Sequence, residues 1–425
     1  MKKVVITGIG MITAVGNGKD ATWASIKAAK PGIGRITKFD ASRCTCQVAA
    51  EVKGFEEYAI GGGLLDRREA RHMAEFTKYA VAAAAEAWKD AGFADMRKEG
   101  SEGFRPDMDR VGTMLGVGIG GIEVTGESFK TLFDRGPDRL SPLAIPELIS
   151  NEGAGNIAIA IGAKGPAQVV TTACASSSDA LGFALDMIRA GRADVMIAGG
   201  AEATIIEFCV GGFMKEKALA THFNDAPEKS CRPFNADRDG FVMGEGSAIL
   251  ILESEDHARA RGAKVYAELA GYGATCDSYH ITAPDPSGDG AVKAIEIALR
   301  DAGVADRTTV DYINAHGTST HLNDSMETKA FKRVFGEDQA KKINISSTKP
   351  FHGHCLGATG AIEAAITAMS IKEGWVPPTL NYENPDPELD LNYTPNQGVA
   401  RDIRVAVSTS LGFGGHNGVL VFKKA

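Results

Sequence analysis

The sequence has no apolar run long enough to cross a lipid bilayer, since no stretch of about 18 consecutive apolar residues follows the N-terminal segment. Residues 1–20 imitate a signal peptide, with an apolar stretch and Ala14-Val15-Gly16 as a possible cleavage site. Gly8, Gly10 and Thr13 interrupt that stretch. We therefore favour the alternative, the first strand of an α/β domain, and expect no association with a membrane.

Cysteine and positive charge are also scarce. The chain has seven cysteines, an odd number scattered over its length, which is typical of free thiols in a reducing cytoplasm rather than of a disulfide framework. Acidic residues outnumber basic ones by 54 to 46, for a net charge of -8. Phosphate backbones and anionic lipids do not attract such a surface, which argues against binding of nucleic acids or membranes. We expect a cytoplasmic protein.

The chain is long and has ample apolar content. Its 425 residues exceed the size at which one hydrophobic core usually stops growing, so we expect two domains or two fused halves. Hydrophobic residues make up 44% and charged residues 24%, as in ordinary globular proteins. A charged segment at 255–265 breaks the apolar rhythm. We place the join there, with one half at 1–260 and the other at 261–425.

Short β-rich runs alternate with helical patterns, which predicts an α/β fold with buried sheets covered by helices. The Pro- and Asn-rich segment 375–396 is interpreted as a surface excursion. Two glycine patterns, at 8–16 and 116–121, lack the context of a dinucleotide-binding loop and are interpreted as tight strand ends. The predicted strands lie within residues 2–10, 110–118, 167–173, 194–200, 246–253, 310–317, 342–348, 403–410 and 417–423.

Both halves carry the same unit of strand, small-residue loop and buried helix. In each unit, apolar residues recur at i, i+3, i+4 and i+7, and a glycine follows the helix at Gly191 or Gly374. The first buried face consists of Leu181, Ala184, Leu185 and Ile188, and the second of Ile362, Ala365, Ile366 and Met369. The repeat suggests that the halves have related folds.

Cys174 lies between a predicted buried strand and the first of these helices. Its sulfur would face unpaired N–H groups at the positive end of the helix dipole, which favours the thiolate and predicts a nucleophile. A small core cysteine is the alternative. The neighbouring residues, Thr172, Ala173, Ala175, Ser176 and Ser177, are small enough to let a ligand approach.

Two histidines occupy comparable places. His316 ends a predicted strand, and His354 lies in the loop before the second helix. Carboxyl ends of strands are where α/β proteins build their sites, so we expect both histidines to share one pocket with Cys174. Each histidine could instead be structural.

Charged and metal-ligating residues surround His354. Lys349 and Glu363 flank it, and a Lys–Glu pair behind the histidine is plausible, with a solvated surface pair as the alternative. His352, His354 and Cys355 could suggest a metal site, but no partner set with zinc spacing accompanies them. We therefore expect no metal.

Five ordered blocks resemble the β-ketoacyl-ACP synthases of the elongating (type II) class, and the resemblance runs over essentially the whole chain. It implies a thiolase-like fold of five layers, α-β-α-β-α, in two related halves, as a homodimer without a cofactor. The blocks are TTACASSSDALGFALDMIRAGRADVMIAGGAEA, FNADRDGFVMGEG, NAHGTSTHLND, STKPFHGHCLGATGAIEAA and SLGFGGHN.

The resemblance also implies a ping-pong reaction. Cys174 would take an acyl chain from acyl-ACP as a thioester, and malonyl-ACP would then lose carbon dioxide and attack that thioester. His316 and His354 would donate hydrogen bonds to the malonyl thioester oxygen, and the N–H groups of Cys174 and Phe413 would form the oxyanion hole for acyl transfer. Phe413 matches the gate between the acyl and malonyl pockets. Supporting roles fall to Lys349, Glu363, Thr318 and Thr320.

Carrier-protein docking would need a local basic patch, because ACP is acidic. Arg67, Arg68, Arg71 and Lys217 lie where the family's contacts fall, although as charges alone they would be interpreted as solvated helix faces. The chain departs from the family's usual pattern at Asp179, His321, Pro350, Phe351, His352, Leu411 and His416. None of these departures removes a catalytic group, but several lie near the pocket and leave chain-length preference open.

Other functions remain as alternatives. A thiolase needs a second cysteine in the final glycine-rich loop, which GFGGHN lacks, and the initiating synthases have Asn where this chain has a second His. A catalytically inactive partner subunit would lack Cys174. A ketosynthase of a polyketide or specialised lipid pathway shares every motif and stays open.

Overall fold

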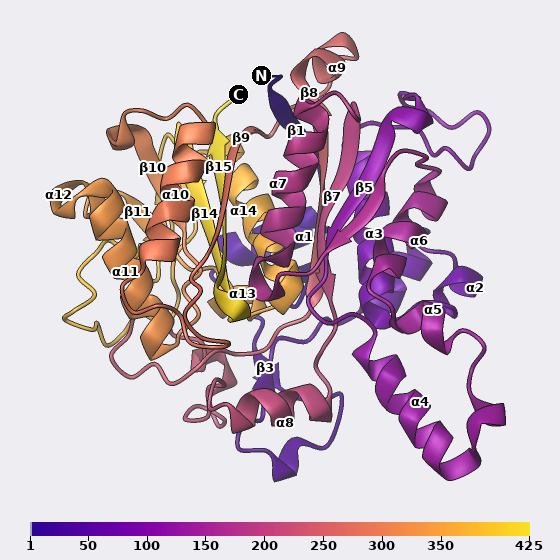
Figure 1. Ribbon diagram of the computed structural model, residues 1–425, viewed down its shortest axis with the longest axis horizontal. Coiled ribbons are helices and arrows are strands. Elements are labelled where there is room, and N and C mark those ends of the chain that lie inside the picture. The colour runs from indigo at the N-terminus through magenta and orange to yellow at the C-terminus, as the bar shows by residue number, and fades with distance from the viewer. Residues whose placement is uncertain (1) are drawn as a thin grey trace.

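The computed structural model describes residues 2–425 and is an α/β protein built on two five-stranded half-sheets (Figure 1). The N-terminal half-sheet has the order β6-β5-β7-β8-β1, and the C-terminal one β11-β10-β14-β15-β9. The strands of the first are β1 (Val4–Thr13), β5 (Val111–Gly116), β6 (Ala167–Val170), β7 (Val195–Glu202) and β8 (Gly246–Ser254). Those of the second are β9 (Ala267–Cys276), β10 (Val310–Asn314), β11 (Asn344–Ser346), β14 (Val405–Gly412) and β15 (His416–Lys423).

The two half-sheets have the same topology. In each, the second strand in chain order pairs in parallel with the third and the fourth, and the fourth pairs antiparallel with the fifth. The fifth strand then pairs antiparallel with the first. A short contact between β1 and β9, where Val5 pairs with Glu268 and Ile6 with Ala267, joins the halves into one ladder.

Helices separate and cover the half-sheets, which gives five layers (Figure 1). The two helices predicted from the repeat form the middle layer, and each contacts strands of both halves. They are α7 (Ser176–Arg189) and α14 (Thr359–Glu373). The outer layers are formed by α3 (Glu75–Asp90) and α6 (Asn151–Ile161) on one side, and by α10 (Asp289–Asp301) and α11 (His321–Phe335) on the other.

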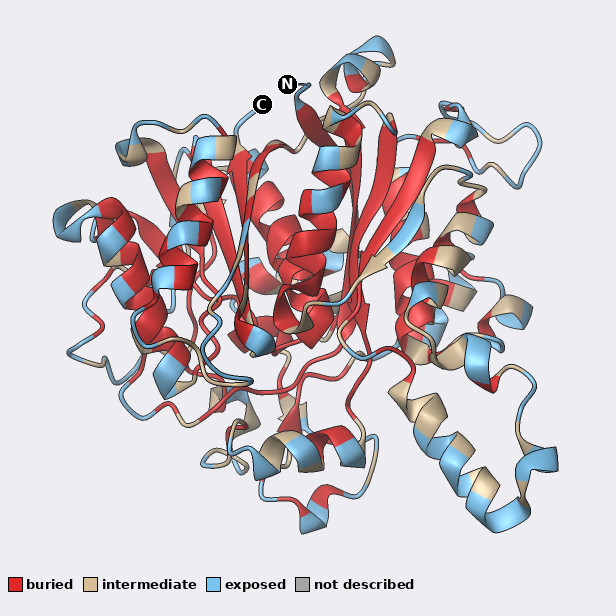
Figure 2. Ribbon diagram, viewed as in Figure 1, coloured by how far each residue is buried: buried red, intermediate tan, exposed pale blue. Residues whose placement is uncertain are grey.

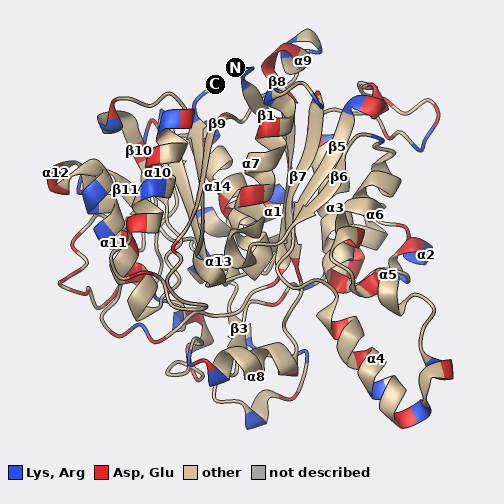
Figure 3. Cartoon of the chain, viewed as in Figure 1, with Lys and Arg blue, Asp and Glu red and all other residues tan. Residues whose placement is uncertain are grey.

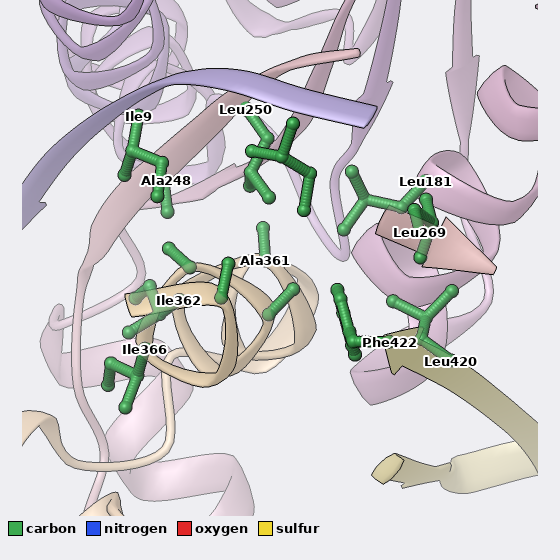
Figure 4. Packing of buried hydrophobic residues seen from close by; sticks show 14 of the residues in the cluster. Ile9, Leu181, Ala248, Leu250, Leu269, Ala361, Ile362, Ile366, Leu420 and Phe422 are labelled. Atoms are coloured by element: carbon green, nitrogen blue, oxygen red, sulfur yellow. The ribbon is translucent and has the colours of Figure 1, made fainter. Parts of the chain in front are cut away.

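The inner strands β1, β5, β7, β8, β10, β14 and β15 are largely buried on both faces because they lie between two layers of helices. In β8, Leu250 and Leu252 point into the central core, whereas Ile249 and Ile251 point into the outer core against α3. Figure 2 shows the strands and the two middle helices as the most continuously buried part of the chain. Figure 4 shows Leu250 in the central core with residues of both halves.

Glycines let helices approach the strands closely in both halves. A Cβ at Gly8 or Gly10 of β1 would lie 2.2 or 2.0 Å from a carbonyl oxygen of α3, and one at Gly271 or Gly273 of β9 would lie 2.4 or 2.3 Å from a carbonyl oxygen of α10. The interpretation of Gly8 and Gly10 as a tight strand end was therefore wrong, because helix contact inside the strand requires them. The glycines of β9 allow the same close approach of a helix, and they interrupt the apolar pattern of this strand, which the sequence did not predict.

The segment 375–396 is more than the predicted surface excursion. It has little regular structure, but Leu389, Leu391 and Tyr393 are buried in the outer core beside α11. The Pro- and Asn-rich composition of the segment gave no indication that these three residues are buried. Within residues 2–425, no helix is both long and apolar enough to cross a membrane.

The remaining elements lie around this framework. Helix α4 (Ile122–Arg135) projects from the N-terminal half and has no buried residue (Figure 2). The other helices are α1 (Lys19–Lys27), α2 (Arg67–Ala70), α5 (Ala144–Leu148), α8 (Glu207–Lys215), α9 (Glu255–Ala260), α12 (Glu337–Ala340) and α13 (Lys349–His352). The short strands are β2 (Gly16–Asn17), β3 (Gly34–Arg35), β4 (Val48–Ala49), β12 (Trp375–Val376) and β13 (Val399–Ala400).

Candidate active site

One cavity of about 490 Å³ lies where the two middle helices begin. Cys174 follows β6 in a short 3-10 turn that leads into α7, and His316 follows β10. His354 follows β11 and α13 and precedes α14. Because the halves have the same topology, their strand ends and helix starts meet at the centre, and all three side chains line the cavity.

The sulfur of Cys174 faces an imidazole. Its Sγ lies 3.1 Å from His354 Nε2, and the side chain is buried. The preceding residue, Ala173, has a φ of 51°, a strained conformation that turns the chain from the strand into the helix.

The thiol is not the stabilised thiolate that the helix start predicted. Burial raises the pKa of Cys174 to about 12, although Lys349 and the backbone N–H groups of Phe413 and Cys174 favour the anion. Desolvation outweighs these contributions because the sulfur has lost most of its contact with water. The proton must therefore pass to a base, and His354 is the nearest one.

Both histidines are neutral. Burial, reinforced by the charge of Lys349, holds the pKa of His316 and of His354 well below the usual value. The two rings are 5.2 Å apart at their centroids and nearly perpendicular. The Nδ1 atom of His354 lies 2.9 Å from Thr359 Oγ1, and the Nδ1 atom of His316 lies 3.5 Å from Lys349 Nζ.

Lys349 and Glu363 form a buried pair rather than the solvated one considered as the alternative. Lys349 Nζ donates to Glu363 Oε1 at 2.6 Å and also to the His316 carbonyl oxygen, and neither side chain exceeds 1% exposure. Burial raises the pKa of Glu363 to about 7 even beside the lysine. An ammonium donor next to His316 Nδ1 leaves that nitrogen as an acceptor, so the proton of the neutral ring is on Nε2.

The walls and mouth of the cavity hold further predicted residues. Thr318 and Thr320 line it with their hydroxyl oxygens 2.9 Å apart. Phe413 lines it too, in the turn after β14, with its ring 6.2 Å from that of Phe213. Lys217 is also part of the lining.

The other predicted docking residues lie elsewhere. Arg67 and Arg68 are in α2, and Arg71 caps that helix. None of the three lines the cavity, and Figure 3 shows α2 at the right edge of the view, whereas α8, which precedes Lys217, lies at the bottom. Of the four predicted docking residues, only Lys217 lines this cavity.

Most departures from the family pattern do not line the cavity. Pro350, Phe351 and His352 are buried in α13, where His352 Nε2 lies 3.0 Å from Thr348 Oγ1. His321 and Leu411 do line the cavity. The metal alternative finds no support in the contacts, since the Cys355 thiol donates to the His352 carbonyl oxygen while the imidazole of His354 faces Cys174.

Sequence reasoning missed Glu202, a buried carboxylate at the end of β7. It accepts hydrogen bonds from the backbone N–H groups of Gly118, Ile119, Gly120 and Gly357. The carboxylate thus ties the glycine pattern at 116–121 to the start of α14. A charged residue at the end of the apolar run DVMIAGGAEA was the signal that could have identified it.

Comparisons with known proteins all point to one family. The chain matches the beta-ketoacyl synthase N-terminal domain over residues 1–258 and the corresponding C-terminal domain over 266–383. The 3-oxoacyl-[acyl-carrier-protein] synthase 2 of Staphylococcus aureus (strain COL) is 47% identical over 425 residues, which covers 100% of this chain and 98% of that protein. The protein of that name from Synechocystis sp. is 48% identical over 423 residues, with coverage of 100% and 98%.

Solved structures agree. A beta-ketoacyl synthase from Burkholderia phymatum STM815 superposes with a TM-score of 0.89 and 35% identity, covering 100% of both chains. A type II PKS ketosynthase in complex with its acyl-carrier protein gives a TM-score of 0.89 and 34% identity, covering 100% of this chain and 99% of that one. The predicted thiolase-like fold of two related halves is confirmed. The chain belongs to the beta-ketoacyl synthase family.

Proposed function

We propose that the protein is a 3-oxoacyl-ACP synthase that elongates fatty acyl chains, with Cys174 as nucleophile and His316 and His354 as the groups that act on malonyl-ACP. The observation that carries this assignment is the 3.1 Å approach of Cys174 Sγ to His354 Nε2, with His316 beside it in one cavity. A catalytically inactive partner subunit would not need a thiol placed next to a histidine in a cavity.

Acyl transfer begins at the sulfur. Cys174 attacks the carbonyl carbon of acyl-ACP while its proton moves to His354 Nε2. The N–H groups of Cys174 and Phe413, which already face the sulfur, stabilise the oxyanion of the tetrahedral intermediate. When the carbon–sulfur bond to the carrier breaks, the departing thiolate takes the proton from His354. The enzyme is left as a thioester with a neutral histidine.

Condensation uses the second histidine. His316 donates a hydrogen bond from its Nε2–H to the thioester oxygen of malonyl-ACP, because Lys349 fixes that tautomer. The bond to the carboxylate breaks, carbon dioxide leaves, and its electron pair forms an enolate that attacks the acyl group on Cys174. The cysteine thiolate leaves and takes up a proton from solvent, which is the one proton that the decarboxylative condensation consumes. His354 contributes a second hydrogen bond, since the hydroxyl of Thr359 can pair with either tautomer of that ring.

Supporting residues divide the cavity. Phe413 acts as the gate between the acyl and malonyl sides of the cavity. The hydroxyls of Thr318 and Thr320 form hydrogen bonds with the polar linker that joins the substrate to the carrier protein. Lys217 contributes to docking of the acidic carrier protein at the mouth. The arginines of α2 would contribute through a separate surface. We also retain the division into halves at residue 260 and a cytoplasmic location as parts of this proposal.

The functional unit is proposed to be a homodimer. Strand β6 pairs only with β5 among the described strands, and Ala167 and Gln168 on it are exposed. On α4, Phe129 and Phe133 are 53% and 79% exposed. An unpaired strand edge and exposed aromatic rings favour association with a second copy.

Sedimentation of a Phe133→Asp variant tests the homodimer, with Phe208→Asp as control because Phe208 is 75% exposed on a different helix, α8. Only the first variant should become monomeric. If the unchanged protein already sediments as a monomer, or if Phe133→Asp leaves the dimer intact, the proposed association surface is wrong.

Intact-mass analysis after exposure to acyl-ACPs of different chain lengths tests the reaction. The expected result is one acyl adduct on the protein and none on Cys174→Ala, with decarboxylation of malonyl-ACP lost in His316→Ala. Acyl adducts on Cys174→Ala would refute the assignment of the nucleophile. Acylation by a polyketide carrier alone would favour the specialised pathway, for which the type II PKS ketosynthase that is 34% identical to this chain is an example.

A further inference from the structure

Asp179 is a buried carboxylate near the active site that the proposed chemistry does not use. It lies in the first turn of α7 and is 5% exposed. Two hydroxyls hold it: Thr172 Oγ1 donates to Oδ2 at 2.6 Å, and the Tyr272 hydroxyl donates to Oδ1 at 2.9 Å. A buried carboxylate is costly unless its hydrogen bonds are satisfied, so this arrangement needs a reason.

The surroundings leave room for this carboxylate and this phenol only because two neighbours are glycines. A Cβ at Gly418 of β15 would lie 2.7 Å from Asp179 Oδ1. A Cβ at Gly182 of α7 would lie 2.3 Å from the Tyr272 ring. Asp179 therefore links the nucleophile's helix, in the N-terminal half, to β9 and β15 of the C-terminal half.

The hydrogen bond to Thr172 reaches the nucleophile's own loop. Thr172 stands directly before Ala173, whose φ of 51° is strained, and Cys174 follows. Backbone contacts close the same loop, since the Thr172 N–H donates to Ser176 Oγ at 2.9 Å and the Thr172 carbonyl accepts from Ala175 N at 3.0 Å. Such a strained turn persists only when its surroundings fix it.

The gate packs against this loop as well. A Cβ at Gly412 would lie 3.0 Å from both the Thr172 carbonyl oxygen and the Cys174 nitrogen. A shift of Thr172 would therefore move the sulfur, its N–H group and the backbone that leads into Phe413.

We propose that Asp179 is a positioning residue that fixes the Thr172-Ala173 turn through its hydrogen bond to Thr172 and thereby aims the sulfur of Cys174 at the incoming acyl group. This inference rests on the proposed acyl-transfer role of Cys174. It assigns no contact between Asp179 and substrate.

A double-mutant cycle tests it. Asp179→Ala and Thr172→Val should each slow single-turnover acyl transfer from acyl-ACP by about ten-fold or more, because small displacements of a reacting atom cost that much. The double variant should be no slower than the slower single variant. Tyr272→Phe, which removes the other hydrogen bond to the same carboxylate, is the matched control and should slow transfer by less than about three-fold. Decarboxylation of malonyl-ACP should stay within about three-fold of the unchanged protein in all variants, because it depends on the histidines.

Two further measurements keep the outcome decisive. Asp179→Asn preserves shape and one acceptor, so it should recover most of the rate lost in Asp179→Ala, and it carries the test if the alanine variant fails to fold. Alkylation of Cys174 by iodoacetamide, in a Cys276→Ser background that removes the exposed thiol, should slow in parallel with acyl transfer.

Additive losses in the Asp179/Thr172 cycle would overturn the inference, and so would equal losses of acyl transfer and decarboxylation. If the unchanged protein takes no acyl group from any acyl-ACP, the proposed function fails. The alkylation rates would then still decide whether Asp179 positions the thiol.

Discussion

Replacing Glu363 by Gln should make the protein's stability less dependent on pH and the protein less active. Burial raises the pKa of Glu363 from 4.5 to about 7, so the folded state holds the proton more tightly than the unfolded chain. Stability linked to this group is therefore fully present below pH 4.5 and is lost as the pH rises toward 7. A difference of this size corresponds to about 3 kcal/mol. Because Lys349 keeps its charge, removing Glu363 alone also leaves a buried charge without its partner, which typically costs about 3–5 kcal/mol.

The assay is urea unfolding of both proteins at pH 5 and pH 8, at one protein concentration. Between pH 5 and pH 8 the unchanged protein should lose about 3 kcal/mol more stability than Glu363→Gln, because glutamine cannot ionise. Malonyl decarboxylation should fall, since the charge that orients Lys349 beside His316 is gone. The same stability difference between the two proteins at both pH values would refute the reasoning.

Other consequences of burial and close packing can be measured directly. The alkylation rate of Cys174 should rise about ten-fold per pH unit from pH 7 to pH 10 without a plateau, because burial raises its pKa to about 12. The rate is measured by mass spectrometry of the alkylated protein, and a plateau near pH 7 would contradict this prediction. Gly10→Val should destabilise the protein by about 3 kcal/mol or more in urea unfolding, since a Cβ there would lie 2.0 Å from the Ala83 carbonyl oxygen. Gly126→Ala, in the exposed helix α4 where nothing lies within 4 Å, should instead stabilise it by about 0.5–1 kcal/mol; equal effects of the two substitutions would show that the packing argument is wrong.

The sequence by itself determined most of the framework. Nine predicted strands correspond to strands of the two half-sheets, and the periodicity after Cys174 and before Gly374 identified the buried faces of α7 and α14. These features were readable because strand and helix periodicity are local properties of the chain. Cys174, His316 and His354 were expected in one pocket because each lies at or after the end of a predicted strand, and the structure brings all three to one cavity.

Only the tertiary structure decided how that site behaves. The helix start suggested a thiolate at Cys174, but the depth of burial raises its pKa instead. Lys349 and Glu363 could have been a surface pair, but the structure buries both side chains. In the sequence, Asp179 was only a departure from the family pattern. The structure shows that it accepts hydrogen bonds from two hydroxyls, one from each half. Desolvation and convergent hydrogen bonds depend on residues that are far apart in the sequence, so no local sequence pattern predicts them.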